Sequence, residues 1–567
     1  MKKTIWTLVC CMLTQFTVAQ VTPKWAEKAK KAVFSIVTYD KNNQIKGTGN
    51  GFYIDAKGTA LSDFSLFEGA ERAVIINADG KQADVTSISG ANSMYDIVKF
   101  VTPVDKKQIT LTLAMQPAKV GETVYLLPYS TQKATTCQTG KVTAVDSIGN
   151  NSFYYTLEMK TTEKIVSCPI MNAAGQVLGM IQKNASEEST ESYAIGASYG
   201  AALSVSALAM NDAALSSIGI KKTLPDTEEQ AFVFLHMSSS MMSEEDYLEL
   251  IQDFMNKFPN SYDGYLQRAL YFIENKKADR YAQANEDLEK AIEISNKKPE
   301  VKHHVAKAIY AYRVSVPESE TPYESWTYER ALNLIQDAVK EDPQGLYLQL
   351  EGDILFAQKN YAEAFNSFDR VNKTTMASPV TFYSAAKAKQ LTEGSDINEV
   401  IALMDSAIVR FNKPYISEAA PYFYERATLK ADAKKYREAV LDYNQFEEIV
   451  GSNASAAFYF EREQVEMQCR MYKQALDDIN KAAELAPDNV DVMLEKGAVH
   501  LRVNQVDEAL AAFQKVVSLD NQSAAGYRLL GYAQALKKMK KEACANFDKA
   551  KALGDELVDK LIEKYCK

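Results

Sequence analysis

The chain has 567 residues, of which 46% are hydrophobic and 24% are charged, and its formal net charge is −10. A chain of this length is too long for one hydrophobic core and predicts several domains or a repeat array. The acidic balance disfavours a nucleic-acid partner, because nucleic acids are bound through a basic face.

The first nineteen residues have the pattern of an export signal. Two lysines at 2–3 precede a mostly apolar stretch at 5–13, and small residues at 17–19 offer a cleavage site before Gln20. The apolar run is shorter than the ~20 residues that a membrane-spanning helix needs. We therefore expect a signal peptide at 1–19, export to the periplasm, the cell envelope or the exterior, and no integral membrane span.

Residues 25–220 have the pattern of a β-rich domain. Short apolar runs at 33–37, 74–77, 124–127 and 177–181 are bounded by Gly, Asn and Asp turn signals. Asp79-Gly80, between two runs, is a typical hairpin turn. These patterns predict antiparallel β-structure.

Several segments of this domain share a pattern with one protease family. Residues 47–54 read GTGNGFYI, residues 60–70 read ALSDFSLFEGA, and residues 95–100 read YDIVKF. They resemble the first barrel of trypsin-like serine proteases of the HtrA kind. Residues 165–179 resemble the family's stretch around its nucleophilic serine. The resemblance implies an all-β trypsin-like double barrel.

The same resemblance implies where a catalytic triad would lie. Ser65 stands where the family has its general-base His, and Val166 stands where it has its nucleophilic Ser, so that only the third member remains, as Asp96. A serine hydroxyl needs an adjacent base, and no His lies in the first 235 residues. Lys164 replaces a glycine of the oxyanion hole, which predicts a distorted hole. We expect a pseudoprotease without catalytic residues.

Two further hypotheses concern the same domain. An active serine or cysteine peptidase with a non-standard site would have to use Asp96, Ser65, Ser167 or Cys168, and His236 is the only His near enough in sequence to assist. The strand expected at 193–197 could bind an extended peptide by strand addition if its edge is open.

The cysteines do not form a disulfide framework. Seven Cys become five once the signal is removed, an odd number at irregular spacing. Cys137 and Cys168 would allow one bridge in an oxidising compartment, and two buried thiols are the favoured interpretation. Cys10 and Cys11 leave a lipoprotein signal as an alternative. No Cys or His grouping has zinc-ligand spacing, so we expect no metal and no cofactor.

Residues 221–242 are expected to be a linker or a helix end, and from about 243 the pattern has a period near 34. Gly497, Ala509, Phe513 and Val516 are followed 34 residues later by Gly531, Ala543, Phe547 and Ala550. Small residues at this spacing let two antiparallel helices approach closely. The pattern resembles the tetratricopeptide repeat (TPR) and predicts an all-α solenoid over 243–567, with about eight repeats and a capping helix at 556–565.

The TPR resemblance implies a concave groove that holds a peptide or protein ligand. Repeat offsets predict that six side chains face it: Tyr383, Tyr424, Phe460, Gln464, Arg528 and Tyr532. A mixture of aromatic and Arg residues suits a binding surface, and the alternative is that these residues pack between neighbouring repeats.

These patterns favour an exported scaffold or adaptor that binds a protein partner. The alternative is an active endopeptidase that uses its repeats to recruit substrates. A third hypothesis is that the barrel is only a structural cap and that the repeats alone bind.

Overall fold

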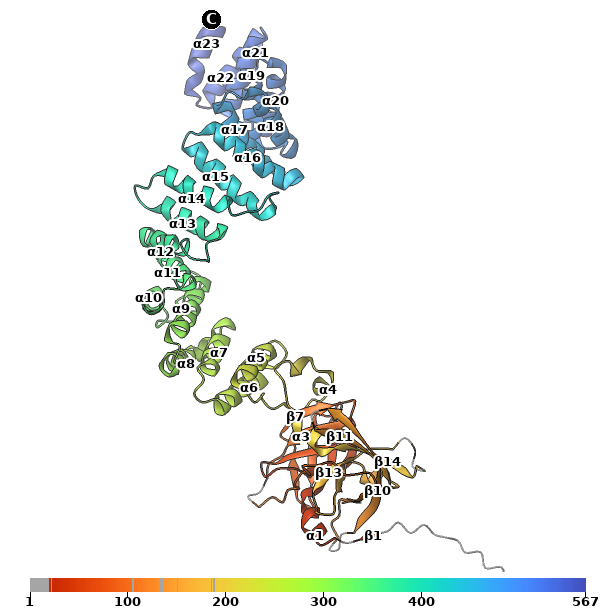
Figure 1. The fold of residues 1–567 in the computed structure, drawn as a ribbon. Coiled ribbons are helices and arrows are strands. Elements are labelled where there is room, and N and C mark those ends of the chain that lie inside the picture. The colour runs from red at the N-terminus through yellow and green to blue at the C-terminus, as the bar shows by residue number, and fades with distance from the viewer. Residues whose placement is uncertain are drawn as a thin grey trace, which may run out of the picture. The chain divides into compact units, whose positions relative to one another are not determined.

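The computed structural model describes residues 20–21, 23–104, 107–132, 136–149, 151–184, 186 and 189–567. The signal peptide expected at 1–19 lies outside the described residues. The chain divides into two compact units, Met1–Phe272 with Ala282–Ser295, and Ile273–Tyr281 with Asn296–Lys567. All described strands belong to the first unit, and the second is helical (Figure 1).

One seven-stranded sheet of the first unit has the order β6-β5-β2-β3-β4-β8-β7. All of its pairings are antiparallel, and buried side chains alternate with less buried ones along much of β2, as expected for strands with one face in a core. Gly80, in the expected hairpin turn, has a φ of +79°. The strands are β2 (Val33–Tyr39), β3 (Ile45–Tyr53), β4 (Thr59–Ser62), β5 (Arg72–Ile76), β6 (Gln82–Asp84), β7 (Ser87–Asn92) and β8 (Ile97–Val101).

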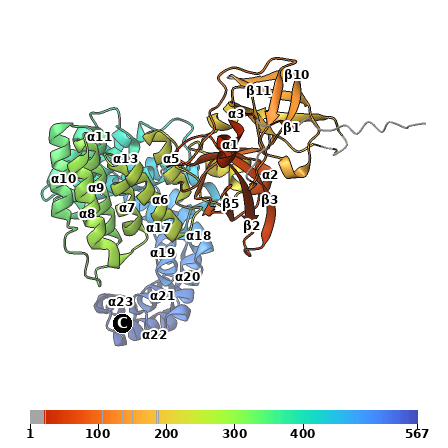
Figure 2. The same ribbon diagram turned by 90° about the horizontal axis from the view of Figure 1, so that it is seen from below.

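The other seven-stranded sheet has the order β1-β10-β11-β14-β13-β12-β9, and β9 also pairs with β10. Its strands therefore return on themselves and form a barrel. Figure 2 shows β2, β3 and β5 in one group and β1, β10 and β11 in another. The strands are β1 (Gln20–Val21), β9 (Thr123–Leu126), β10 (Cys137–Gly149), β11 (Ser152–Glu158), β12 (Pro169–Met171), β13 (Val177–Ile181) and β14 (Glu191–Gly196).

Helices complete the first unit and extend its core. Phe234 and Leu235 of α5 and Phe254 of α6 are buried in the same apolar cluster as Phe34 and Phe52 of the sheets. Residues 221–242 therefore include a packed helix. The helices are α1 (Ala26–Ala29), α2 (Phe64–Phe67), α3 (Ala197–Ala202), α4 (Ala213–Ser216), α5 (Glu228–Ser238), α6 (Glu244–Lys257), α7 (Asp263–Glu274) and α8 (Tyr281–Ile294), and the last two cross the boundary between the units.

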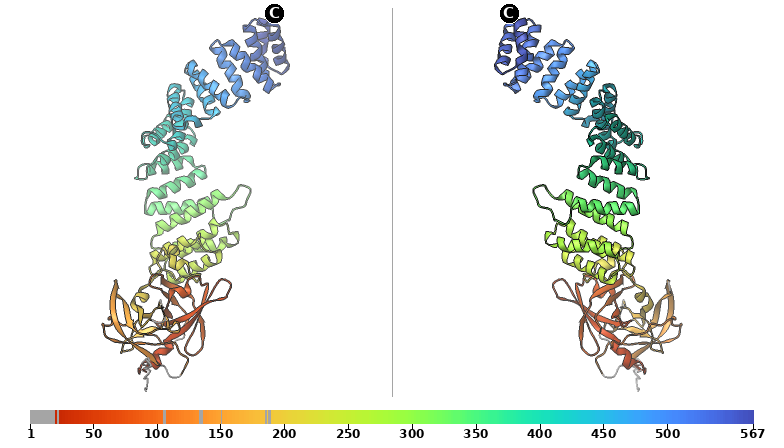
Figure 3. Two further views of the ribbon diagram at one scale, coloured as in Figure 1. Left: turned by 90° about the vertical axis from the view of Figure 1, so that its right-hand side faces the viewer. Right: turned by 90° about the vertical axis from the view of Figure 1, so that its left-hand side faces the viewer.

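The second unit consists of successive helix pairs, which lie side by side in both views of Figure 3. Within the described residues, no helix has the length and apolar character needed to cross a bilayer. The helices are α9 (Lys298–Ser315), α10 (Tyr328–Glu341), α11 (Gly345–Ala357), α12 (Tyr361–Val371), α13 (Pro379–Leu391), α14 (Ile397–Ile408), α15 (Ala420–Asp432), α16 (Tyr436–Val450), α17 (Ala456–Gln468), α18 (Tyr472–Leu485), α19 (Val490–Arg502), α20 (Val506–Leu519), α21 (Ala524–Leu536), α22 (Lys540–Ala552) and α23 (Asp559–Tyr565).

Small residues face aromatic rings within several of these pairs. A Cβ added at Gly497 would lie 2.3 Å from the ring of Phe513, and one added at Gly531 would lie 2.7 Å from the ring of Phe547. Any larger residue would push the two helices apart. This contact is the physical reason for the spacing of Gly and Phe in the sequence.

One disulfide closes the C-terminal end of the chain. Cys544 of α22 is bonded to Cys566, which follows α23. Cys137 and Cys168 are buried free thiols, so the favoured interpretation of these two residues agrees with the structure. The irregular spacing of the cysteines did not predict this bridge, which ties Cys566 to α22.

Candidate functional site

Ser65 and Asp96, which the resemblance places in the triad, are in contact. The backbone N–H of Ser65 donates to Asp96 Oδ1 at 2.7 Å, and its hydroxyl lies 3.1 Å from Asp96 Oδ2. The short helix α2 presents Ser65, and Asp96 immediately precedes β8. The fold thus brings these two positions together, with the hydroxyl of Ser65 beside the carboxylate of Asp96.

A second carboxylate, that of Asp63, joins this site. Its Oδ2 lies 3.3 Å from the hydroxyl of Ser65, and its Oδ1 accepts from Ser167 at 2.5 Å. The hydroxyl of Ser62 lies 3.0 Å from the same Oδ1 and donates at 2.7 Å to the carbonyl of Asn50. Ser65 has one hydroxyl proton and donates to one of the two carboxylates at a time. Sequence reasoning missed Asp63, and its place two residues before Ser65 was the only signal.

The environment of Asp96 raises the pKa of its carboxyl group above the ordinary value. Burial raises the pKa of Asp96, and the negative charge of Asp63 raises it further, against the opposing hydrogen bond from the backbone of Ser65. An aspartate can orient an imidazole but does not take its place as the base that activates a serine.

Val166 offers no nucleophilic atom, and the backbone around it is engaged within the protein. The N–H of Val166 donates to the carbonyl of Glu163 at 3.4 Å, at the end of a 3-10 turn. The side-chain amide of Asn50 donates to the carbonyls of Lys164 and Val166 at 3.1 and 2.9 Å. An oxyanion hole needs free N–H groups that point at the substrate, and the N–H of Val166 is already used.

Ser167 and Cys168 are both buried. The hydroxyl of Ser167 is occupied by Asp63, and its φ of +66° is a left-handed conformation for which glycine is the usual residue. Burial raises the pKa of Cys168 to about 12, whereas a nucleophilic cysteine needs a lowered one. His236 lies in α5, and among the described residues its side chain makes no hydrogen bond to Ser167 or Cys168.

The strand expected at 193–197 corresponds to β14 and has neighbours on both sides. Ala194 pairs with Tyr155 of β11 and with Ile181 of β13. Ile195 is paired in the same way on both sides. The condition for strand addition, an open edge, is therefore not met at these residues.

Most of the six side chains predicted to line a groove contact other parts of the array. The ring of Tyr383 lies 5.5 Å from that of Tyr422, and the ring of Tyr532 lies 6.1 Å from that of Tyr565. Arg528 donates to Asp555 at 2.7 Å. Each of these three side chains is also partly exposed.

The remaining three belong to α15 and α17. Tyr424 donates to Glu461 and packs with Phe460 against the same apolar cluster. Gln464, on α17, is exposed. Of the six residues, Gln464 is the side chain most accessible to a partner.

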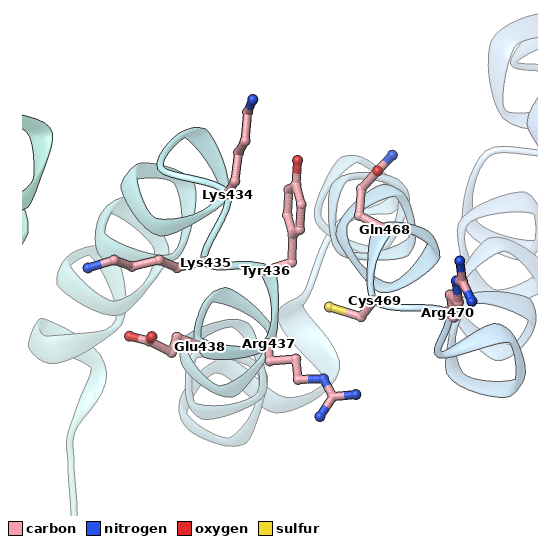
Figure 4. Close-up of a pocket in the computed structure, with 8 residues that line it drawn as sticks. All are labelled: Lys434, Lys435, Tyr436, Arg437, Glu438, Gln468, Cys469 and Arg470. Carbon is pink, nitrogen blue, oxygen red and sulfur yellow. The ribbon is translucent and has the colours of Figure 1, made fainter.

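A polar hollow of about 400 Å³ lies between two helix turns of the second unit. Figure 4 shows Lys435 and Arg470 at opposite outer sides of it, with Tyr436 and Cys469 between them. Its cationic side chains do not converge on one point, and none of the six predicted groove residues lines it. In the part of the chain that the structure describes, no group of three or more His, Cys, Asp and Glu residues is placed to hold a metal ion.

Comparisons with known proteins give no family assignment. No protein-family model matches the sequence, and no curated protein matches it. The active form of the Rv3671c protease from M. tuberculosis is 17% identical, with 38% of this chain and 96% of that chain covered and a TM-score of 0.28. An inactive serine-to-alanine form is 17% identical, with 33% and 95% covered and a TM-score of 0.27. At these TM-scores the likeness carries no argument about this chain.

Proposed function

We propose that this protein is an exported scaffold or adaptor, in which an inactive trypsin-like double barrel is joined to a TPR array that binds a protein or peptide. The observation that carries the proposal is the contact between Ser65 and Asp96. The group beside the carboxylate of Asp96 is the hydroxyl of Ser65 rather than an imidazole, and the side chain of Val166 supplies no nucleophile.

The chemistry of the site supports loss of catalysis. Acyl transfer from a serine needs a nucleophile, a base and free donors for the oxyanion. Here the hydroxyls of Ser65 and Ser167 hydrogen-bond to carboxylates, and the N–H of Val166 donates to Glu163. A network in which these groups satisfy one another suits a structural role.

The helix pairs support a role in binding. Recurrent contacts between Gly and Phe give pairs of similar geometry, and stacked pairs of this kind build extended binding surfaces. We place the partner on the first helices of the pairs, with Gln464 as the most accessible predicted contact.

Export is supported by the sequence of residues 1–19 and by the disulfide between Cys544 and Cys566. Structural disulfides persist in oxidising compartments. N-terminal sequencing of the exported protein should give a chain that begins at Gln20.

The test of the pseudoprotease is labelling of the full chain with a fluorophosphonate and with a thiol-directed peptide probe, alongside casein cleavage. We expect neither labelling of residues 25–220 nor cleavage, with trypsin as the positive control. Labelling together with turnover would overturn the proposal.

The short contact between Ser167 and Asp63 favours one second candidate, a peptidase that uses this pair. The burial of Ser167 argues against this candidate, because a substrate would have to reach the Ser167 hydroxyl. Turnover that Ser167→Ala abolishes and that Ser65→Ala leaves unchanged would establish it.

A further inference from the structure

Glu463 occupies a position that is small in other helix pairs. The equivalent residues of the neighbouring pairs are Ala427, before it, and Gly497, after it. The aromatic residue found sixteen positions after the small residue, as in Gly497 and Phe513, is here replaced by Ile479. A carboxyl-bearing side chain thus stands at a position where the neighbouring pairs have at most a methyl group.

This carboxyl is buried without a partner. Glu463 is 0% exposed, and among the described residues neither of its carboxylate oxygens has a hydrogen-bond partner. One turn further along α17, Glu466 is 2% exposed, and its Oε2 also lacks a partner. An ionised carboxylate in such a place is strongly disfavoured, because burial removes its hydration and nothing replaces it.

The charged groups that face Glu463 come from three helices and are mostly negative. They are Glu466 on its own helix, Asp478 on α18, and Glu495 and Arg502 on α19. The exposed Arg502 is the one cation among these groups, and it lowers the pKa of Glu463, whereas the acids raise it. Burial and the three acids raise the pKa of Glu463 to about 8.

The nearest buried cation is already engaged. Arg462, beside Glu463 in sequence, donates to Asp478 at 2.7 and 2.8 Å and to Glu447 at 2.6 Å. Burial and Asp478 raise the pKa of Glu466 to about 8 as well, although Arg462 opposes this. The two glutamates share one buried interface. Arg462 Nε lies 4.0 Å from Glu466 Oε1, whereas Glu463 has no ion pair among the described residues.

We infer that the contact of α17 with α18 and α19 is a proton-controlled joint, which is closed while Glu463 is protonated and opens more readily as its proton is lost. This inference does not depend on the proposed function. In this inference the controlling side chain is Glu463, whose carboxyl group becomes hydrated only when the helices separate.

The direction of the pH dependence follows from linkage. The closed joint holds the proton more tightly than the open one, so its full stability is present below the ordinary pKa of glutamate. That stability is lost as the pH rises towards the raised value near 8. Between these limits the opening equilibrium grows about tenfold per pH unit for each proton released.

Hydrogen exchange of the full chain, corrected for the intrinsic effect of pH, tests this inference. Between about pH 5.5 and about pH 7.5 we expect protection of α17 to fall about 100-fold relative to α11, which carries Gly352 at the equivalent position. Because burial and Asp478 raise the pKa of Glu466 to about 8 as well, this fall is measured in the Glu466→Gln variant, in which Glu463 alone releases a proton, and adding Glu463→Gln should remove most of it. Glu484→Gln, an equal change of charge at an exposed site on α18, should leave it in place.

Two outcomes would overturn the inference: the same pH dependence in α17 and α11, or a fall that persists when Glu463→Gln is added to Glu466→Gln. If that variant does not fold, Glu463→Ala, which restores the residue type of Ala427, replaces it. Infrared spectroscopy of the unaltered protein gives a second readout. The carbonyl band of a protonated carboxyl should persist well above pH 5 and disappear near pH 8, and its absence at neutral pH would contradict the inference.

Discussion

Ser65 is joined to Asp96 by two hydrogen bonds, one from its backbone N–H and one from its hydroxyl, at 2.7 and 3.1 Å. The carboxylate of Asp63 lies 3.3 Å from the same hydroxyl. Two acids therefore share one serine, and their repulsion gives the site a pH dependence that can be measured.

Asp96→Asn should raise the stability of the first unit more at neutral pH than in acid. Burial and Asp63 raise the pKa of Asp96 in the folded protein. The ionised carboxylate therefore destabilises the folded state at a pH above this raised pKa. At a pH below the ordinary aspartate pKa of about 4 the group is protonated in both states and has no such effect. Urea unfolding near pH 7 and near pH 4 measures the difference. Glu68→Gln, at an exposed neighbour, is the control, and an equal gain at both pH values would refute this explanation.

Gly175→Ala should destabilise the barrel by about 2–4 kcal/mol, since it combines a strained backbone with a steric clash. The φ of Gly175 is +78°, and an added Cβ would lie 2.7 Å from Trp25 Cγ. Gly80→Ala is the matched control, because its φ is +79° and nothing lies within 4 Å of its added Cβ, so about 1 kcal/mol is expected. Hydrogen exchange under increasing urea, followed in β13 for Gly175→Ala and in β5 for Gly80→Ala, measures the two losses, and equal losses would contradict the clash.

Asp442→Ala should cost about 3–5 kcal/mol, because it leaves buried cations without their partner. The side chain of Asp442 is 6% exposed and is paired with Arg426 and Lys430. The control removes Asp405, the other carboxylate that is paired with the guanidinium of Arg426. Asp405 is 54% exposed, and Asp405→Ala should cost under about 1 kcal/mol. Thermal unfolding of the array compares them, and similar losses would show that burial does not set the strength of these pairs.

Replacing Cys544 and Cys566 together by serine should weaken the attachment of α23 by about 3 kcal/mol, the value expected when a cross-link spanning 22 residues is removed. Limited proteolysis should then cleave near α23 first. Cys469→Ser, at a thiol without a disulfide partner, should not change the cleavage pattern. Unchanged resistance of the double variant would mean that apolar packing alone holds the last helix.

Strong local patterns allowed the two regions to be predicted from sequence. Short apolar runs bounded by turns such as Asp79-Gly80 predicted the β-rich region, and the spacing of Gly497 and Phe513 predicted paired helices. The contact of Ser65 with Asp96 was implied only by the family resemblance, because 31 residues separate them and no local pattern connects them.

Features that depend on three-dimensional packing were not predicted. Asp63 joins the site through Ser167, which lies 104 residues away in sequence. Glu463 lies 34 residues before Gly497, so the repeat offset did contain a signal that an acid occupies a small-residue position. Its burial, however, depends on α19, and the lack of a partner follows from Arg462 being engaged by Asp478 and Glu447.

The most direct test of the scaffold proposal is photo-crosslinking from single sites of the full chain in its native host. A photoreactive residue at Gln464, which is exposed on α17, should give a discrete adduct with a partner protein. One at Gln474, which is exposed on the second helix of the same pair, should give none. The absence of an adduct at Gln464, or identical adducts at both positions, would contradict a binding surface on the first helices of the array.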